Sequence, residues 1–138
     1  MRFLLFFCGI SIIALGLAGP RVLEENDAMG FLSGALTLGG GIVISGLFST
    51  RWFWHGLLGG GVMALLGFSR GLSNLPALPG YLKERFVDQI AGANPMPLLE
   101  SSVTLICLLL LVGVVRTLLA ERRRKSIEAL QALEDGDD

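Results

Sequence analysis

Two glycine-rich apolar stretches decide the fold: GFLSGALTLGGGIVISGLFS at residues 30–49 and GLLGGGVMALLGFSRG at residues 56–71, joined by the aromatic segment RWFWH at residues 51–55. Small residues recur in both stretches every three or four positions, a spacing that places them on one face of an α-helix. Helices in a bilayer gain little by hiding leucine from lipid, so close packing through small residues becomes a main source of association. The pattern predicts a transmembrane helical hairpin. Its predicted packing residues are Gly30, Gly34, Gly41, Gly56, Gly60, Gly67 and Gly71.

Composition supports a membrane location for the rest of the chain as well. Apolar residues make up 52% and charged residues only 17% of the 138 residues, and the charges gather at the ends of long apolar runs, whereas a soluble domain would spread them. We therefore expect an all-α, polytopic four-helix membrane bundle. Its predicted parts are spans at about residues 3–19, 28–49, 52–72 and 100–120, a short interfacial helix at residues 80–91 in the third connection, and a basic then acidic tail at residues 121–138. Residues 126–138 of this tail are expected to form a frayed helical extension with a disordered acidic end.

The first apolar run allows two interpretations. Residues 3–19 are about the shortest length that crosses a hydrocarbon core of roughly 30 Å, and Pro20 denies the helix a donor and ends it. The small residues Gly16 and Ala18 also fit a signal-peptide cleavage site. We favour a retained helix; cleavage would leave three spans with the same orientation.

Interfacial residues predict the orientation. Trp52 and Trp54 flank the hairpin turn, where indole rings favour the headgroup level, and His55 lies in the same belt. A dense run of cations follows the last span and marks the cytoplasmic side under the positive-inside rule. It consists of Arg122, Arg123, Arg124 and Lys125. Beside a membrane span this run is a topology signal or a contact with anionic lipid, so nucleic acid is not an expected partner.

Arg70 and Glu100 are the candidate polar site. They lie at the outer ends of the third and fourth predicted spans, at similar depth, where an ionised group needs a partner or water. One interpretation is a structural ion pair between the two helices. The other is that Arg70 receives an anionic group, such as a lipid phosphate or a carboxylate, while Glu100 sets its geometry.

Motifs for other chemistry are missing from the sequence. It has no Ser-His-Asp set, no paired carboxylates within a span and no phosphate-binding loop, so we expect no catalytic residues and a non-enzymatic protein. Cys8 and Cys107 fit buried small apolar side chains, and together with a single His they have no metal-ligand spacing. No metal or other cofactor is expected.

The segment Gly67-Phe68-Ser69-Arg70-Gly71-Leu72-Ser73, the opening Pro97-Leu98-Leu99-Glu100 and the glycine-rich middle helices carry a resemblance. On them, over about residues 3–118, the chain resembles a bacterial family of small four-helix integral membrane proteins of unknown function, and more loosely the DoxX-like membrane proteins. The resemblance implies Arg70 and Glu100 as matched polar positions. It implies no reaction. The expected location is a bacterial inner membrane, multi-pass, with the C-terminus placed in the cytoplasm by the cationic run.

Two hypotheses for function are consistent with these features. The leading one is a non-enzymatic accessory or scaffold subunit whose small-residue faces engage the helices of other membrane subunits or of a second copy. The alternative is a module that binds or transports a lipid, quinone or small amphiphile near Arg70 and Glu100.

Overall fold

Four long helices form most of the chain. The computed structural model describes residues 2–23, 25–83, 86 and 95–134, and within these residues all regular structure is helical. The elements in order are α1 (Arg2–Ala18), the 3-10 turn η1 (Gly19–Arg21), α2 (Glu25–Arg51), α3 (Phe53–Asn74), the 3-10 turn η2 (Leu75–Ala77), α4 (Leu78–Leu82) and α5 (Met96–Glu134). The all-α prediction is therefore confirmed.

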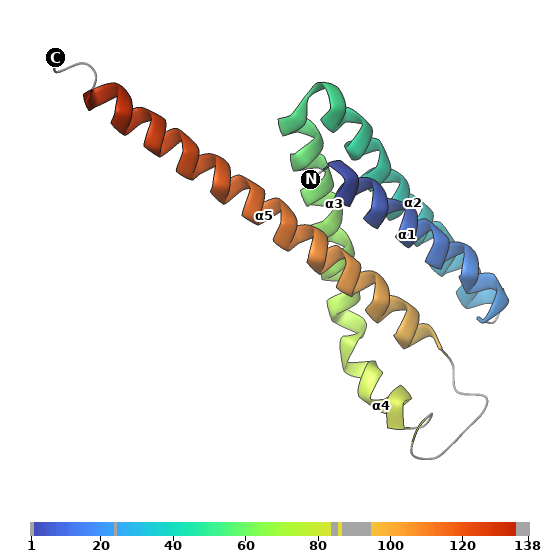
Figure 1. Ribbon diagram of the computed structural model, residues 1–138. Helices are drawn as coiled ribbons and strands as arrows, with labels where there is room; N and C mark the ends of the chain where they lie inside the picture. Colours follow the sequence, from blue (N-terminus) through green and yellow to red (C-terminus); the bar gives the residue numbers. More distant parts are fainter. Residues whose placement is uncertain (1, 24, 84–85, 87–94, 135–138) are drawn as a thin grey trace.

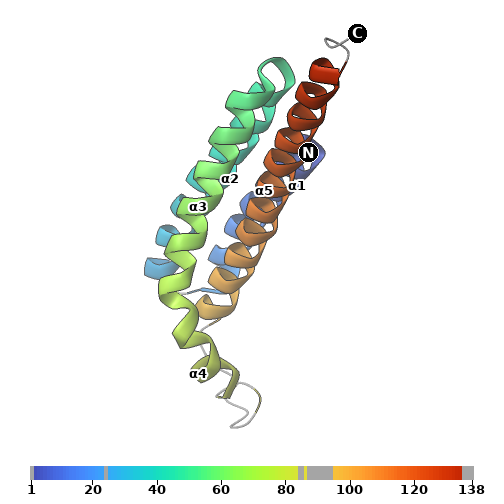
Figure 2. The ribbon, with the colours of Figure 1, turned by 90° about the vertical axis from the view of Figure 1, so that its left-hand side faces the viewer.

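The long helices pack in sequence order, α1 on α2, α2 on α3 and α3 on α5, with a smaller contact between α1 and α5. The N-terminus, the turn between α2 and α3, and the far end of α5 all lie toward one end of the molecule (Figures 1 and 2). The opposite end holds η1, α4 and the start of α5. Because α2 lies between α1 and α3, it has to present close-packing surfaces in two directions.

The turn between α2 and α3 is shorter than the five-residue aromatic segment at residues 51–55. Only Trp52 lies outside a helix there. Its N–H donates to the Phe48 carbonyl at 2.8 Å, and its own carbonyl accepts from the Gly56 N–H at 3.1 Å, so the helical bonding pattern continues almost unbroken through the turn. A Cβ at Gly56 would collide with the backbone of Ser45 and Ser49. The absence of a side chain at Gly56 is what lets α3 fold back directly on α2.

Buried residues from α1, α2, α3 and α5 form one core. The inward surface of α3 contributes small residues, since Gly56, Gly60, Ala64, Gly67 and Gly71 are all buried. Larger side chains from the other helices fill the space next to them. The core cluster is Leu5, Cys8, Ile12, Leu23, Ala28, Phe31, Ala35, Ile42, Ala64, Val103, Cys107 and Leu110. Both cysteines are buried and free, as the sequence suggested.

Three helical segments in the described part of the chain are long and apolar enough to cross a membrane: Phe3–Arg21, Asp27–Arg51 and Met96–Gln131. Apolar side chains around them are widely exposed, including Phe3, Ile44 and Leu109 at 91%, 54% and 58%, which is typical of a lipid-facing surface. The chain therefore has the character of a membrane protein. α3 has 22 residues, but its glycines, His55 and Arg70 lower its hydropathy, and its crossing of the membrane stays a prediction.

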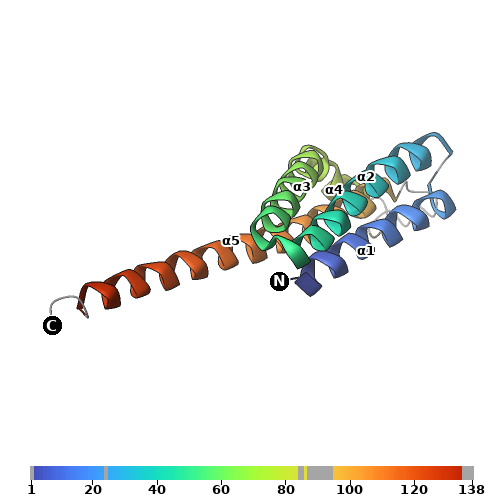
Figure 3. The ribbon, with the colours of Figure 1, turned by 90° about the horizontal axis from the view of Figure 1, so that it is seen from above.

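α5 is much longer than the predicted fourth span. It runs for 39 residues without a break, which is about 58 Å at 1.5 Å per residue. The part after Ala120 continues past the other helices (Figure 3), so most of the tail predicted at residues 121–138 belongs to this helix. In the third connection, α4 covers residues 78–82, whereas most of the interfacial helix predicted at residues 80–91 lies outside the described residues.

Candidate functional site

Arg70 is the one Lys, Arg, Asp or Glu residue of α3, and the packing of α3 decides where its side chain goes. Gly67 and Gly71 on either side of it are buried against α5, where added Cβ atoms would meet the side chains of Cys107 and Thr104. The close approach of α5 leaves no room for a long side chain in that direction. Arg70 therefore extends toward α2, at the end of the bundle opposite the hairpin turn.

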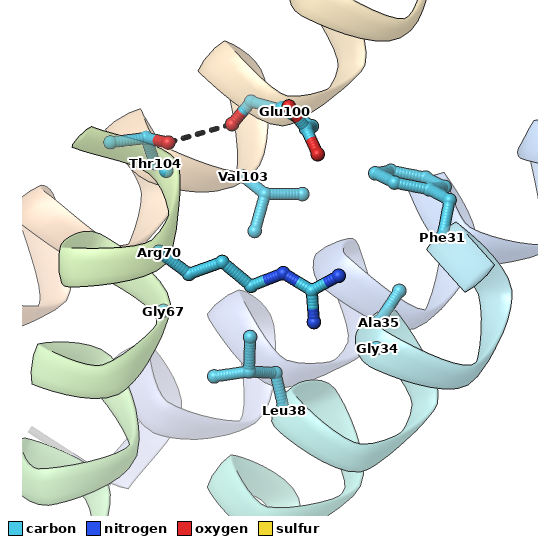
Figure 4. Close-up of a pocket in the computed structure, with 10 residues that line it drawn as sticks. Phe31, Gly34, Ala35, Leu38, Gly67, Arg70, Glu100, Val103 and Thr104 are labelled. Carbon is cyan, nitrogen blue, oxygen red and sulfur yellow. Dashed lines mark hydrogen bonds between the residues drawn. The ribbon is translucent and has the colours of Figure 1, made fainter. Parts of the chain in front are cut away.

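The Arg70 side chain, which is itself exposed, forms one side of a partly open cavity of about 40 Å³ between α2, α3 and α5 (Figure 4). Since a water needs roughly 10–15 Å³ of such volume, the cavity has room for about three water-sized groups. Apart from Arg70, Glu100 and Thr104, its walls are apolar or glycine. The lining residues are Phe31, Gly34, Ala35, Leu38, Gly67, Arg70, Gly71, Glu100, Val103 and Thr104.

The guanidinium lies directly over Gly34 of α2. A Cβ built on Gly34 would be 3.2 Å from Nη1 and 3.7 Å from Cζ of Arg70, so the missing side chain makes the space that the guanidinium occupies. Gly34 follows Asp27 by seven residues, about 10 Å of helix. If Asp27 marks the headgroup level, the charge of Arg70 lies within the outer part of the hydrocarbon layer. A charge at such a depth needs compensation by a counter-charge, by water or by a ligand.

Glu100 lines the same cavity without pairing directly with Arg70. Figure 4 shows the guanidinium beside Gly34 and Ala35, the Glu100 carboxyl group at the opposite side of the cavity, and Val103 between them in this view. Among the residues drawn, the one hydrogen bond runs from Thr104 Oγ1 to the Glu100 backbone carbonyl, at 2.7 Å. The structure thus brings the two predicted polar residues to one cavity but gives no ion pair between them in the described residues.

A second, larger hollow lies on the exposed side of Arg70. This groove has a volume of about 450 Å³ and runs between α2 and α3, within the range of small-molecule sites. It shares Gly34, Leu38 and Arg70 with the inner cavity, so the guanidinium belongs to both spaces. Its lining residues are Ser33, Gly34, Thr37, Leu38, Met63, Leu66 and Arg70.

Hydroxyl groups on the α2 side make this groove partly polar. The Ser33 hydroxyl donates to the Gly30 carbonyl at 3.0 Å, and the Thr37 hydroxyl donates to the Ser33 carbonyl at 2.8 Å. Such bonds within a helix satisfy the hydroxyl hydrogen in an apolar environment and leave the oxygen lone pairs as acceptors. The groove is therefore polar at Arg70 and along one wall, and apolar at Met63 and Leu66.

The residues predicted for the membrane interface meet at the opposite end of the bundle. The rings of Trp52 and His55 are 5.4 Å apart, and Nζ of Lys125 lies 5.5 Å from the centroid of the Trp54 ring. Trp52, Trp54 and His55 are all exposed, and so are Arg122, Arg123, Arg124 and Lys125 on α5. The Lys125–Trp54 contact brings the basic segment and the hairpin turn to the same end of the molecule.

The predicted packing glycines have different surroundings. At Gly30 no atom of another element of the chain lies within 4 Å of an added Cβ, because the buried surface of α2 is displaced by about one residue from the predicted stripe, so the packing role of Gly30 stays a prediction. Gly34 lies under Arg70. The other contacts join Gly41 to Met63, Gly56 to Ser45 and Ser49, Gly60 to Leu5, Gly67 to Leu38 and Cys107, and Gly71 to Thr104.

A backbone-to-backbone contact between α1 and α2 is absent from the sequence-based prediction. A Cβ on Gly39 would lie 2.9 Å from the Gly9 carbonyl oxygen, and a Cβ on Gly9 would lie 3.0 Å from the Gly39 carbonyl oxygen. The two backbones therefore touch each other at these glycines. A signal was present, since Gly9 and Gly16 in the first span have the same seven-residue spacing as Gly39 and Gly46 in the second.

No family model, curated protein or solved structure matches the chain. The resemblance to small four-helix membrane proteins of unknown function therefore stays a prediction. Function has to be inferred from the geometry around Arg70 and from the placement of the basic end of α5.

Proposed function

We propose that the protein is a multi-pass membrane protein of four spans that binds an anionic amphiphile at Arg70. The observation that supports this most is the position of the guanidinium, which lies over Gly34 between an inner cavity and a lipid-facing groove. A structural ion pair would have placed a carboxylate against it. A ligand anion in the cavity supplies the counter-charge that this depth in the membrane requires.

The chemistry of the lining fits this role. Arg presents a planar set of donors that matches phosphate and carboxylate oxygens. Glu100 on the far side of the cavity is an acceptor, which suits a hydroxyl or a protonated oxygen on the ligand and disfavours a second negative charge there. The proposed function is binding or transfer of a ligand within the membrane, without catalysis.

Binding to the purified protein in mild detergent tests this function. Native mass spectrometry with an added phosphate-bearing amphiphile should show a bound species that Arg70→Gln weakens by at least about tenfold, because hydrogen bonds to charged groups contribute about 1.5–3 kcal/mol. Arg116→Gln is the matched control, since Arg116 is an exposed arginine on α5 outside the site. Equal binding by both variants and the wild type would reject the proposal.

The orientation that we propose has the C-terminus in the cytoplasm and the protein in a bacterial inner membrane. It is supported by the Lys125–Trp54 contact, which joins the cationic segment to the hairpin turn at one end. Because that end carries Arg51 and the four cations of residues 122–125, the positive-inside rule assigns it to the cytoplasm. The Arg70 cavity then opens toward the outer leaflet.

An accessory or scaffold role is the second candidate function, and the length of α5 favours it. Beyond Ala120 this helix continues to Glu134 with exposed apolar residues, Ile127 at 56% and Leu130 at 65%. An exposed helix of this kind is a common docking element for another subunit. An accessory subunit should co-purify at fixed stoichiometry with a partner in several mild detergents, whereas purification as a free monomer in all of them would contradict this role.

A further inference from the structure

We infer that the ligand is a membrane lipid with a phosphate headgroup, which enters sideways from the bilayer, places its phosphate in the Arg70 cavity and lays one acyl chain in the groove between α2 and α3. This inference rests on the proposed function and adds the chemical class of the ligand and its route. It starts from the fact that Gly34, Leu38 and Arg70 line both spaces.

The two spaces differ in the way that the two ends of a lipid differ. The inner cavity, of about 40 Å³, has the size of a few oxygen atoms and holds the charged side chains of Arg70 and Glu100. The groove, of about 450 Å³, is about tenfold larger and lies on the outer surface of the bundle. A soluble anion would occupy only the first space, whereas a phosphate with an acyl chain occupies both.

The length and direction of the groove suit an acyl chain. From Arg70 to Met63 the groove follows seven residues of α3, about 10 Å of helix, or about two thirds of the roughly 15 Å of hydrocarbon in one leaflet. It runs from the charged end toward the membrane centre, in the direction of the tails of the surrounding lipids. Leu66 on its rim is 57% exposed, so a lipid in the leaflet reaches the groove without crossing the bundle.

Gly34 lies where the inner cavity meets the groove between α2 and α3. Its Cα forms the floor under the guanidinium, and a Cβ there would lie 3.2 Å from Nη1 of Arg70. An added methyl group would be closer to Nη1 than an ordinary contact, so the guanidinium would have to shift by a few tenths of an ångström at the opening between cavity and groove. Gly40 on the same helix has nothing within 4 Å of an added Cβ, so Gly40→Ala adds a methyl group to α2 without touching the site.

Three probes separate the headgroup from the tail: lysophosphatidic acid, which has both; monoacylglycerol, which has the tail alone; and inorganic phosphate. Binding is measured by native mass spectrometry on the full chain in mild detergent. We expect lysophosphatidic acid to bind at least about tenfold more tightly than either other probe. Gly34→Ala should weaken its binding by about tenfold, whereas Gly40→Ala should leave it within about twofold of wild type.

The groove is tested by filling it. Thr37→Leu puts a larger side chain into the groove away from Arg70, and Thr50→Leu is its control, because Thr50 is exposed on α2 outside the groove. We expect Thr37→Leu to weaken lysophosphatidic acid to the level of inorganic phosphate, about tenfold or more, while the weak binding of phosphate persists. Thermal unfolding of each variant in the same detergent reports whether it is folded, and a folded Thr37→Leu that binds the lipid like wild type overturns the inference.

The outcomes distinguish this inference from the proposed function. If inorganic phosphate binds as tightly as lysophosphatidic acid and Arg70→Gln abolishes both, the ligand is a soluble anion and the lipid assignment is wrong, while the anion site stands. If Arg70→Gln changes no probe, both are wrong. If cross-linking through Thr37→Cys joins two copies of the chain and the lipid does not compete, a second copy fills the groove and the lipid assignment is again wrong.

Discussion

Gly39 and its neighbour Gly40 allow a test of how α1 and α2 are held together. In Gly39→Ala the new Cβ would lie 2.7 Å from Cγ1 of Ile13 and 2.9 Å from the Gly9 carbonyl oxygen. Ordinary contacts between such atoms are about 3.5–4.0 Å, so the helices have to separate by up to about 1 Å. Added methyl groups in a well-packed core destabilise proteins by about 1–3 kcal/mol, and we expect a loss in this range.

Gly40→Ala is the control, because it makes the same chemical change one residue away in open space. Replacing glycine by alanine in a helix stabilises it by about 0.5–1 kcal/mol, with no packing penalty to offset this at residue 40. The two variants should therefore change the free energy of unfolding in opposite directions and differ by about 1.5–4 kcal/mol. If only the helix propensity of alanine mattered, both variants would raise the free energy of unfolding.

Equilibrium unfolding in mixed micelles, followed by far-ultraviolet circular dichroism, measures this difference. Gly9→Ala should be destabilising as well, and the double variant Gly9→Ala/Gly39→Ala should lose less than the sum, since one separation of the helices relieves both contacts. If Gly39→Ala were as stable as Gly40→Ala, the backbone contact between α1 and α2 would not hold the fold together, and its proposed role in packing would be refuted.

Two further predictions concern the end that carries the hairpin turn. The first uses a background in which Cys8 and Cys107 are replaced by alanine. In it, Thr50→Cys and Ser126→Cys should react with an impermeant maleimide from the same side of the membrane, and Ser73→Cys should react from the other side. Labelling of residues 50 and 126 from opposite sides would disprove the orientation. Lys125→Ala should change the Trp54 fluorescence and lower stability by no more than about 1 kcal/mol, because the Lys125–Trp54 contact is exposed. Arg123→Ala, which changes a neighbouring cation, should leave the fluorescence unchanged.

The inward surface of α3 could be predicted from the sequence because small residues are its main signal. Every fourth or third residue from Gly56 to Gly71 is glycine or alanine, and the structure buries all five of these residues. α3 has only one surface with such a run, so the pattern predicts a single inward surface for this helix. The sequence also places Arg70 and Glu100 at similar depth at the ends of two helices, and in the structure both residues line one cavity.

The inward surface of α2 could not be predicted in the same way, because this helix has two partners. Its glycines lie on two surfaces, with Gly39 against α1 and Gly41 against Met63 of α3. Spacing alone does not say which surface meets which helix, and no other element of the chain lies against Gly30, the first residue of the predicted stripe. The order of packing, with α2 between α1 and α3, supplies the missing information.

Two other differences have local causes. The aromatic turn is reduced to Trp52 because glycine at position 56 lets the backbones cross at once, a steric effect that composition does not reveal. The tail is helical up to Glu134 because residues 114–134 contain no proline or glycine and are rich in Ala, Leu, Arg and Glu, all strong helix formers. That signal is readable in the sequence, whereas the charges of the tail indicate orientation and say little about helix length.

The unbroken length of α5 also has a mechanical consequence. Its 14 residues from position 121 to 134 form a stiff rod of about 20 Å attached to a membrane-embedded segment. A change of about 10° in the tilt of that segment moves the free end of the rod by about 3.5 Å, with no hinge to absorb the motion. A partner that binds residues 121–134 and a ligand that binds between the helices at the other end of α5 would therefore both change the tilt of the same helix. Binding at one end is coupled mechanically to the other end.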